Sequence, residues 1–228
     1  MAEDKNKVNN HKNTMELVGH YGGDTTHCLS AWTSTSRDLD ADKVARMPKL
    51  LASLAKAGHH TPFEKSSLHF LLRTDIATHI QILKHRIGVS LNGESARYKE
   101  LKGDFFYVPQ DWDDEEVKKH IDFCEYALKE YHECLARLVQ KGVPRVRAKE
   151  SARFRLPYAN QIQCDVMFNF RSFTHFLGLR YSVHAQKEIR DLSLEMIKSV
   201  VAIEGNPFKH TLEAFEIVDA NGNIREPY

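Results

Sequence analysis

The sequence lacks the marks of several large protein classes. It has no run of about 18 consecutive apolar residues, so it predicts no membrane-spanning helix. Its first residues, 1–14, contain neither the apolar core of a secretory signal peptide nor the arginines of a transit peptide. Its 4 cysteines form no CxxC pair. Together these absences favour a protein of the reducing cytoplasm.

An excess of charge of one sign is also missing. Lys and Arg total 32 against 31 for Asp and Glu, which removes the electrostatic reason to expect a DNA-wrapping or membrane-surface protein. Hydrophobic residues make up 42% and charged residues 28%, as in ordinary globular proteins. The 228 residues suffice for one large domain or for a core with an appended piece. Any anion that this chain binds must therefore be held by a local group of side chains.

Hydrophobic periodicity predicts helices interleaved with a few strands. Expected helices cover residues 42–58, 75–87, 113–141, 149–154 and 185–203, and expected strands cover residues 15–21, 67–73 and 162–170. Ile76, Ile80, Leu83 and Ile87 form the expected buried face of the second helix. Asn221-Gly222 is typical of a hairpin turn between short strands, and residues 22–36 fit no pattern. The sequence thus predicts an α+β fold with a flexible polar leader over residues 1–14 and a single domain over residues 15–228.

Cations, hydroxyls, an amide and a carboxylate are concentrated between Lys84 and Tyr98. Arginine offers a planar fork of donors to a phosphate, serine adds a hydroxyl, and glycine lets backbone N–H groups approach the ligand. The same segment also fits a basic helix end, because cations in a last helical turn interact favourably with the helix dipole. On local chemistry alone both interpretations stay open.

Four short blocks occur in one order along the chain. They are Gly58-His59-His60-Thr61-Pro62-Phe63-Glu64, then Lys84-His85-Arg86 with Ser95 and Arg97-Tyr98, then Glu150 and Arg153 before Leu156-Pro157, and finally Leu179-Arg180 with His184-Ala185-Gln186 and Glu188-Ile189. One such block alone would be a weak match, whereas four in order are a strong signal. This set resembles the signature of the flavin-dependent thymidylate synthases.

The chain differs from the family pattern at three places. Lys84 stands in place of the first arginine of the family's Arg-His-Arg signature, which keeps the charge but loses the fork of donors. Eight residues, where the family has seven, separate Arg86 from Ser95, so either Gly93 or Glu94 fills the family's glutamate position. His175 stands where many members have asparagine.

The resemblance implies a fold, a reaction and partners. The fold would be a single α+β domain with long helices packed on a small mixed or antiparallel sheet. Family members convert dUMP to dTMP, with methylenetetrahydrofolate as the carbon donor, NADPH as the reductant and FAD as the hydride carrier. They are homotetramers with active sites at subunit interfaces. A chain of this kind would need no metal, no cysteine nucleophile, no nucleic acid and no membrane.

The resemblance also assigns site residues. Arg180 would be catalytic, because a guanidinium beside the uracil stabilises negative charge on N3 and O4 and so makes C5 nucleophilic. Residues expected to bind dUMP are Gln81, Lys84, Glu94, Ser95, Ala96, Arg97, Arg153 and Arg180. Residues expected to bind FAD are His59, Thr61, Glu64, His85, Arg86, Ile87, Asn169, Arg171 and His175.

Each assignment has a plainer alternative. His59-His60 would be a loop after a helix, Glu150 with Arg153 a surface ion pair, Arg180 and Glu188 solvated helix charges, and His175, between Phe173 and Phe176, a core histidine. Three rival functions also stay open. A flavin-free synthase would need a cysteine thiolate, a metal-dependent hydrolase would need a histidine motif that the sequence lacks, and an RNA-binding module would use the basic loop with Arg145, Arg147 and Arg153.

Overall fold

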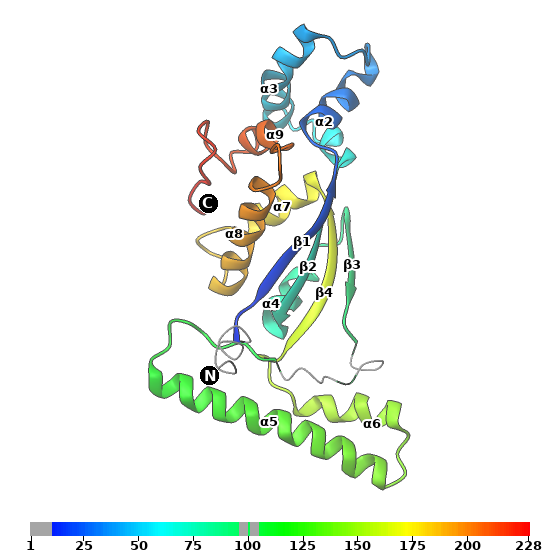
Figure 1. Ribbon diagram of the computed structural model, residues 1–228, viewed down its shortest axis with the longest axis vertical. Helices are drawn as coiled ribbons and strands as arrows, with labels where there is room; N and C mark the ends of the chain where they lie inside the picture. The colour runs from blue at the N-terminus through cyan, green and yellow to red at the C-terminus, as the bar shows by residue number, and fades with distance from the viewer. Residues whose placement is uncertain (1–10, 96–99, 101–104) are drawn as a thin grey trace. The chain divides into compact units, whose positions relative to one another are not determined.

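The computed structural model describes residues 11–95, 100 and 105–228 (Figure 1). By their contacts the described residues divide into two compact units. The long-helix unit contains residues 11–14, 72–82 and the described part of 92–164, and the pocket unit contains residues 15–71, 83–91 and 165–228. The α+β class that the sequence predicts is confirmed, while the single domain over residues 15–228 stays a prediction.

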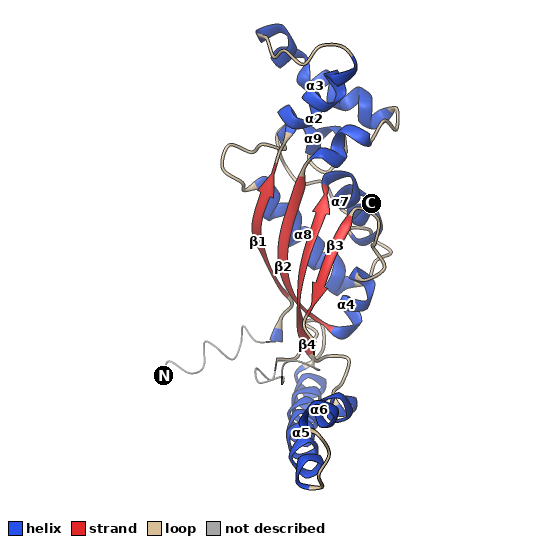
Figure 2. Ribbon diagram, turned by 90° about the vertical axis from the view of Figure 1, so that its right-hand side faces the viewer, coloured by secondary structure: helices blue, strands red, loops and turns tan. Residues whose placement is uncertain are grey.

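Within the described residues, strands β1 (Thr14–Tyr21), β2 (Ser67–Asp75), β3 (Val89–Gly93) and β4 (Gln161–Asn169) form a four-stranded sheet in the order β1-β2-β4-β3. Neighbouring strands run in opposite directions (Figure 2). Three of these strands match their predicted ranges. The fourth strand, β3, was expected to be a loop. Its five residues include a glycine and only two apolar side chains, so they show no strand pattern in the sequence.

In the pocket unit, α7 (Phe170–Arg180) and α8 (Lys187–Val201) cover one face of its part of the sheet, and α2 (Asp24–Ala31), α3 (Ala41–Lys56) and α9 (Lys209–Ala214) lie beyond the end of the strands (Figure 2). A short 3-10 turn, η2 (Trp32–Ser34), follows α2, and another, η3 (Thr61–Lys65), precedes β2. Aromatic rings join α7 to the sheet: Phe70 of β2 stacks on Phe173 at 5.8 Å, and Phe168 of β4 lies 5.3 Å from Phe176. Helices α3 and α8 match their predictions, whereas α2, α7 and α9 were not predicted.

The long-helix unit contains α4 (Ile76–Ile82), α5 (Asp114–Gln140), α6 (Arg145–Ala152) and the 3-10 turn η4 (Arg153–Arg155). The apolar stripe of α5 is buried, and Tyr131 and Leu135 pack with Ala148 and Ala152 of α6. The Asp113 side chain begins α5 by accepting a hydrogen bond from the Glu116 N–H at 2.9 Å. The prediction for α5 over residues 113–141 is therefore confirmed.

The predicted buried face of α4 is wrong. The helix ends at Ile82, and its buried side chains are Thr78, His79 and Ile82. Ile80 is exposed, and Ile87, which lies beyond the helix, is 89% exposed. The side of α4 that carries Thr78 is therefore the buried one. Asp75 accepts hydrogen bonds from the Thr78 N–H and hydroxyl, and these short-range bonds fix the start of the helix with that side turned inward.

Part of the predicted leader belongs to the fold. The Asn13 side chain donates to Asp75 at 2.7 Å and accepts from the Asp75 N–H at 2.9 Å. The Val108 N–H donates to the carbonyl of His11 at 2.9 Å, and Thr14 opens β1. Residues 1–10 of the leader lie outside the described residues.

The segment after α9 makes a turn at the predicted place. Gly222 has φ +83°, and its N–H donates to the carbonyl of Asp219 at 2.9 Å. The expected flanking strands are reduced to one antiparallel bridge between Val218 and Ile224. The sequence therefore predicted the turn correctly but not the irregular segment around it.

Candidate functional site

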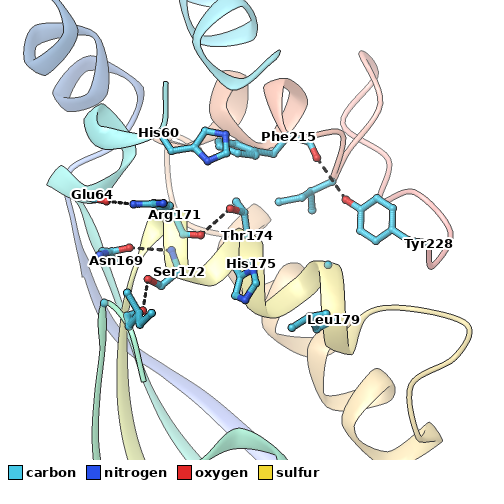
Figure 3. Close-up of a pocket in the computed structure, with 14 residues that line it drawn as sticks. His60, Glu64, Asn169, Arg171, Ser172, Thr174, His175, Leu179, Phe215 and Tyr228 are labelled. Carbon is cyan, nitrogen blue, oxygen red and sulfur yellow. Dashed lines mark hydrogen bonds and ion pairs between the residues drawn. The ribbon is translucent and has the colours of Figure 1, made fainter. Parts of the chain in front are cut away.

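The pocket unit contains a cavity of about 770 Å³ (Figure 3). This volume lies in the range of about 300 to 1,000 Å³ that is typical of small-molecule and cofactor sites. The lining comes from the region of η3, the loop before β3, helix α7 and the segment after α9. The lining residues are His60, Glu64, Ile87, Gly88, Asn169, Arg171, Ser172, Thr174, His175, Gly178, Leu179, Phe215, Ile217 and Tyr228.

One wall of the pocket is built where β4 becomes α7. The Asn169 N–H donates to the carbonyl of Gly88 at 3.0 Å, and the Asn169 side chain caps α7 by accepting from the Ser172 N–H at 2.8 Å. The Ser172 hydroxyl donates to the carbonyl of Ile87 at 2.7 Å. Because of these bonds, the loop before β3 is fixed against the first turn of α7.

Gly88 is required by this close approach. Its φ is +67°, a conformation that side chains disfavour, and a Cβ there would lie 2.2 Å from the Ser172 hydroxyl and 2.4 Å from the Asn169 amide nitrogen. The requirement comes from two residues that are more than 80 positions away in the sequence. A larger residue would therefore separate the loop from the helix.

An ion pair joins η3 to α7 at the same wall. Arg171 lies 2.5 Å from Glu64, and the side chain of Arg171 is half exposed. The positive end of the α7 dipole and the Arg171 guanidinium occupy the same turn of the helix. This wall is therefore suited to an anionic or strongly polar part of a ligand.

His85 and Arg180 form a second polar pair in the pocket unit. The Nε of Arg180 donates to Nε2 of His85 at 3.0 Å, and the His85 ring packs edge-on against Phe176 at 4.9 Å. Burial, followed by the charges of Arg180 and His175, lowers the pKa of His85 to about 4. His85 is therefore neutral at pH 7 and accepts the bond through Nε2, which assigns its proton to Nδ1. The imidazole thus holds the arginine without repelling it.

The structure brings several of the residues expected at FAD to this pocket. Glu64, Ile87, Asn169, Arg171 and His175 line it, and His85 is buried next to His175, with ring centroids 6.2 Å apart. The exposed residues His59, Thr61 and Arg86 are not among the lining residues, and His60 lines the pocket in place of His59. The alternative of a core histidine at position 175 is wrong, because His175 is exposed.

The residues expected at dUMP fall in both units. Arg180 and the exposed Lys84 belong to the pocket unit, whereas Gln81, Glu94, Ser95 and Arg153 belong to the long-helix unit. Ala96 and Arg97 lie outside the described residues. The Glu94 carboxylate accepts from the Gln163 N–H at 3.1 Å, and the Glu94 N–H donates to the Gln163 carbonyl at 2.8 Å. The Arg153 guanidinium lies 5.9 Å from the ring of Phe154.

Several lining residues were missed by the sequence analysis. Ser172 is one of them, although it follows the expected residue Asn169 at the spacing of a helix N-cap, so a signal was available for the start of α7. Gly88 lies inside the basic segment but carries no side chain to mark it. His60 and Leu179 stand in the quoted sequence blocks but were given no role there, and no sequence signal pointed to Thr174, Gly178, Phe215, Ile217 and Tyr228.

The described residues contain neither a cluster suited to a metal ion nor a membrane-spanning helix. Among them, no group of three or more His, Cys, Asp or Glu side chains is placed to hold a metal ion. Across residues 11–95, 100 and 105–228, no helix combines the length and the apolar composition needed to cross a membrane.

Comparison with known proteins points to one family. Residues 16–204 match the family model described as "Thymidylate synthase complementing protein". The chain is 32% identical over 196 residues to the flavin-dependent thymidylate synthase of Pseudothermotoga lettingae, covering 82% of this chain and 85% of that protein. It is 31% identical over 228 residues to the enzyme of the same name from Thermosipho melanesiensis, covering 93% and 94%.

A similar fold is found among solved structures. The structure of a UMP/dUMP methylase, PolB from Streptomyces cacaoi bound with 5-Br dUMP, superimposes with a TM-score of 0.73 and 28% sequence identity. The match covers 90% of this chain and 95% of that one.

Proposed function

Because the chain belongs to the flavin-dependent thymidylate synthase family, we propose that it methylates dUMP to dTMP. Methylenetetrahydrofolate donates the carbon, and NADPH supplies the reducing equivalents through bound FAD. The enzyme acts in the cytoplasm as a homotetramer with active sites at subunit interfaces. One observation carries the proposal: Glu64, Asn169, Arg171 and His175, which the resemblance to the family assigns to FAD, line one pocket.

The lining of the pocket fits a flavin nucleotide. The first turn of α7 suits its pyrophosphate because the positive end of the helix dipole lies there, and the half-exposed Arg171 adds donor groups while it also pairs with Glu64. Ile87, Leu179 and Phe215 offer apolar surface to its rings. When bound, FAD supplies the hydride chemistry, which amino-acid side chains do not provide. The side chains of this chain bind and orient the cofactor and the nucleotide.

Arg180 is the residue to which we assign the chemical step. A guanidinium beside the uracil stabilises the negative charge that develops on N3 and O4, and this makes C5 nucleophilic. His85 positions Arg180 through the bond to its Nε, and because His85 is neutral it leaves the full positive charge available to the substrate.

Two of the cysteines, Cys28 and Cys124, support a reaction without a thiolate. Burial, with the nearby Asp24 charge, raises the pKa of Cys28 to about 12, and burial raises that of Cys124 to about 11. A thiol with such a pKa is protonated at pH 7 and is a poor nucleophile. All 4 cysteines are free, which agrees with the proposed cytoplasmic location.

The first test is an absorbance spectrum of the purified protein, followed by titration with dUMP. We expect the bands of an oxidised flavin, and we expect dUMP to shift them because nucleotide and flavin lie together. Production of dTMP should require both methylenetetrahydrofolate and NADPH. A protein that neither contains flavin nor takes up added FAD would contradict the proposal.

Substitution of Arg180 tests its assigned role. Arg180→Ala should lower kcat/KM for dUMP by about 100- to 1,000-fold, as is usual when one stabiliser of a developing anion is removed. Arg137→Ala is the matched control, because Arg137 also lies in the last turn of its helix but pairs with Glu130 on the surface. The control should keep normal kinetics. Near-normal turnover by a flavin-loaded Arg180→Ala variant would refute the role.

A further inference from the structure

The segment from Phe215 to Tyr228 lies outside the region that the family model matches, residues 16–204. Nevertheless, Phe215, Ile217 and Tyr228 line the pocket together with His60, Glu64 and Leu179 of the first and last sequence blocks, and Figure 3 labels Phe215 and Tyr228 there. None of the assigned site residues comes from this segment. Its role in the pocket therefore requires a separate explanation.

The start of the segment is held by ring packing and by backbone bonds. The ring of Phe215 lies edge-on to Phe63, with centroids 4.7 Å apart, and 5.4 Å from the ring of His60. Ile217 is buried, its N–H donates to Leu212, and its carbonyl accepts from the Arg225 N–H, both at 3.0 Å. This part of the pocket wall is therefore fixed in place without a ligand.

Tyr228 is held by its backbone. Its N–H donates to the carbonyl of Tyr181 at 3.2 Å, and its carbonyl accepts from the Val183 N–H at 2.8 Å and from the Ser182 hydroxyl at 3.1 Å. The phenol hydroxyl donates to the carbonyl of Phe215 at 3.4 Å. The side chain remains 49% exposed although the backbone is fixed, so a large part of the ring is available for contact.

The two sides of the pocket differ in chemistry. Glu64, Asn169, Arg171 and Ser172 supply charges and hydrogen-bonding groups, whereas Leu179, Phe215, Ile217 and Tyr228 supply apolar and aromatic surface. A ligand that matches both sides combines an anionic or polar part with a flat aromatic ring. Aromatic rings bind each other in offset or edge-to-face arrangements that an apolar wall with two aromatic side chains can provide.

We propose that Phe215, Ile217 and Tyr228 form an apolar wall that binds a ring system of the flavin nucleotide, with Tyr228 as a contact residue. This inference rests on the proposed function, which identifies the ligand. It adds a part of the cofactor site that the four sequence blocks do not contain. Tyr228 contributes to FAD binding through its ring, because the hydrogen bond of its hydroxyl, to the carbonyl of Phe215, is long.

The test is FAD binding to the apoprotein, followed by quenching of flavin fluorescence. Tyr228→Ala should weaken FAD binding about tenfold, because it removes the ring contact. Tyr228→Phe keeps the ring and should stay within about twofold of the unsubstituted protein. Tyr126→Ala is the control, since Tyr126 is an exposed tyrosine of α5 in the other unit, and it should leave the affinity unchanged. Titrations with FMN, which carries the isoalloxazine ring, and with ADP, which carries the adenine ring, show which ring system of FAD binds the apolar wall.

A second variant guards against a folding defect. Leu179 is 51% exposed on α7 and lines the same side of the pocket, so Leu179→Ala should weaken FAD binding about threefold with an unchanged melting temperature. If the unsubstituted protein binds FAD and both alanine variants bind it equally well, the apolar wall is refuted and the proposed function stands. If the unsubstituted protein does not bind FAD, both proposals fail.

Discussion

Helices α5 and α7 are stabilised in different ways. Helix α5 buries one apolar stripe and carries ion pairs on its exposed face, such as Lys119 with Glu115 at 2.8 Å. Helix α7 buries aromatic side chains such as Phe173 and Phe176, and its first turn is fixed in addition by a few individual bonds, where Asn169 and Ser172 meet the loop at Gly88. An amphipathic stripe spreads its stabilisation over many side chains, whereas the start of α7 relies on individual atoms.

This difference determines what each region tolerates. A surface ion pair contributes little to stability, so changes on the exposed face of α5 should have small effects. In contrast, a single carbon added at Gly88, next to the first turn of α7, would clash with Ser172 and Asn169. We therefore expect the effects of matched substitutions in the two regions to differ in size. Two pairs of substitutions test this expectation, and a change of pH tests the buried histidines of the pocket unit.

The largest effect is expected for Gly88→Ala compared with Gly142→Ala. Both glycines have positive φ, +67° and +84°, but no atom lies within 4 Å of a Cβ at Gly142. Gly142→Ala should therefore cost only about 1 kcal/mol of backbone strain. Gly88→Ala adds a clash with Ser172 and Asn169 and should cost more than about 3 kcal/mol. Urea unfolding of both variants measures the difference, and equal losses would contradict the described approach of loop and helix.

An intermediate effect on the free energy of unfolding is expected when the pH is lowered. His27 is fully buried among the rings of Phe63, Phe170 and Phe208, and burial lowers its pKa from 6.5 to about 4. The unfolded chain binds a proton at His27 between these two pH values and the folded chain does not. Stability is therefore complete above pH 6.5 and is lost as the pH falls toward 4. His85, whose pKa is lowered in the same direction, adds to the loss.

Unfolding in urea at pH 7 and at pH 5 measures this effect, and His27 alone should account for about 2 kcal/mol of the difference. Asp24 opposes part of the loss, because burial raises its pKa and the folded state binds its proton more tightly. Asp24 reaches His27 through the Thr211 hydroxyl. His27→Gln should flatten the dependence on pH. An unchanged slope in that variant would show that other groups cause it.

The smallest effect is expected from the two helix caps. Asp113→Ala removes the cap of α5 and should cost about 1 kcal/mol. Asn169→Ala removes the cap of α7 at a similar cost in stability but should also weaken FAD binding, because Asn169 lines the pocket. Melting temperature and FAD titration separate the two effects. FAD affinity that falls equally in both variants would indicate a general loss of stability instead of a local contact.

How well an element could be predicted from the sequence depended on whether its apolar residues repeat regularly. The long helices α3, α5 and α8 and the strands β1, β2 and β4 were predicted, because their apolar residues repeat with the period of the element. Helix α7 was missed because its sequence, Phe170 to Arg180, is aromatic on several sides and is closed in by other elements. The face of α4 was predicted wrongly because Thr78 and His79 are buried by local hydrogen bonding.

Of the expected cofactor residues, Glu64, Ile87, Asn169, Arg171 and His175 line the pocket, and they were expected there because of the resemblance to the family. The wall formed by Phe215, Ile217 and Tyr228 could not be identified in this way. In the sequence each of these residues belongs to no motif, and only the fold brings them to the pocket.

The sequence by itself determined the family, the α+β class and the positions of the amphipathic elements, since these depend on local order and spacing along the chain. Only the tertiary structure decided which side chains share the pocket, why position 88 must be glycine and how His85 holds Arg180. These features depend on distances between residues remote in sequence, and such distances are set by packing, which no local pattern records.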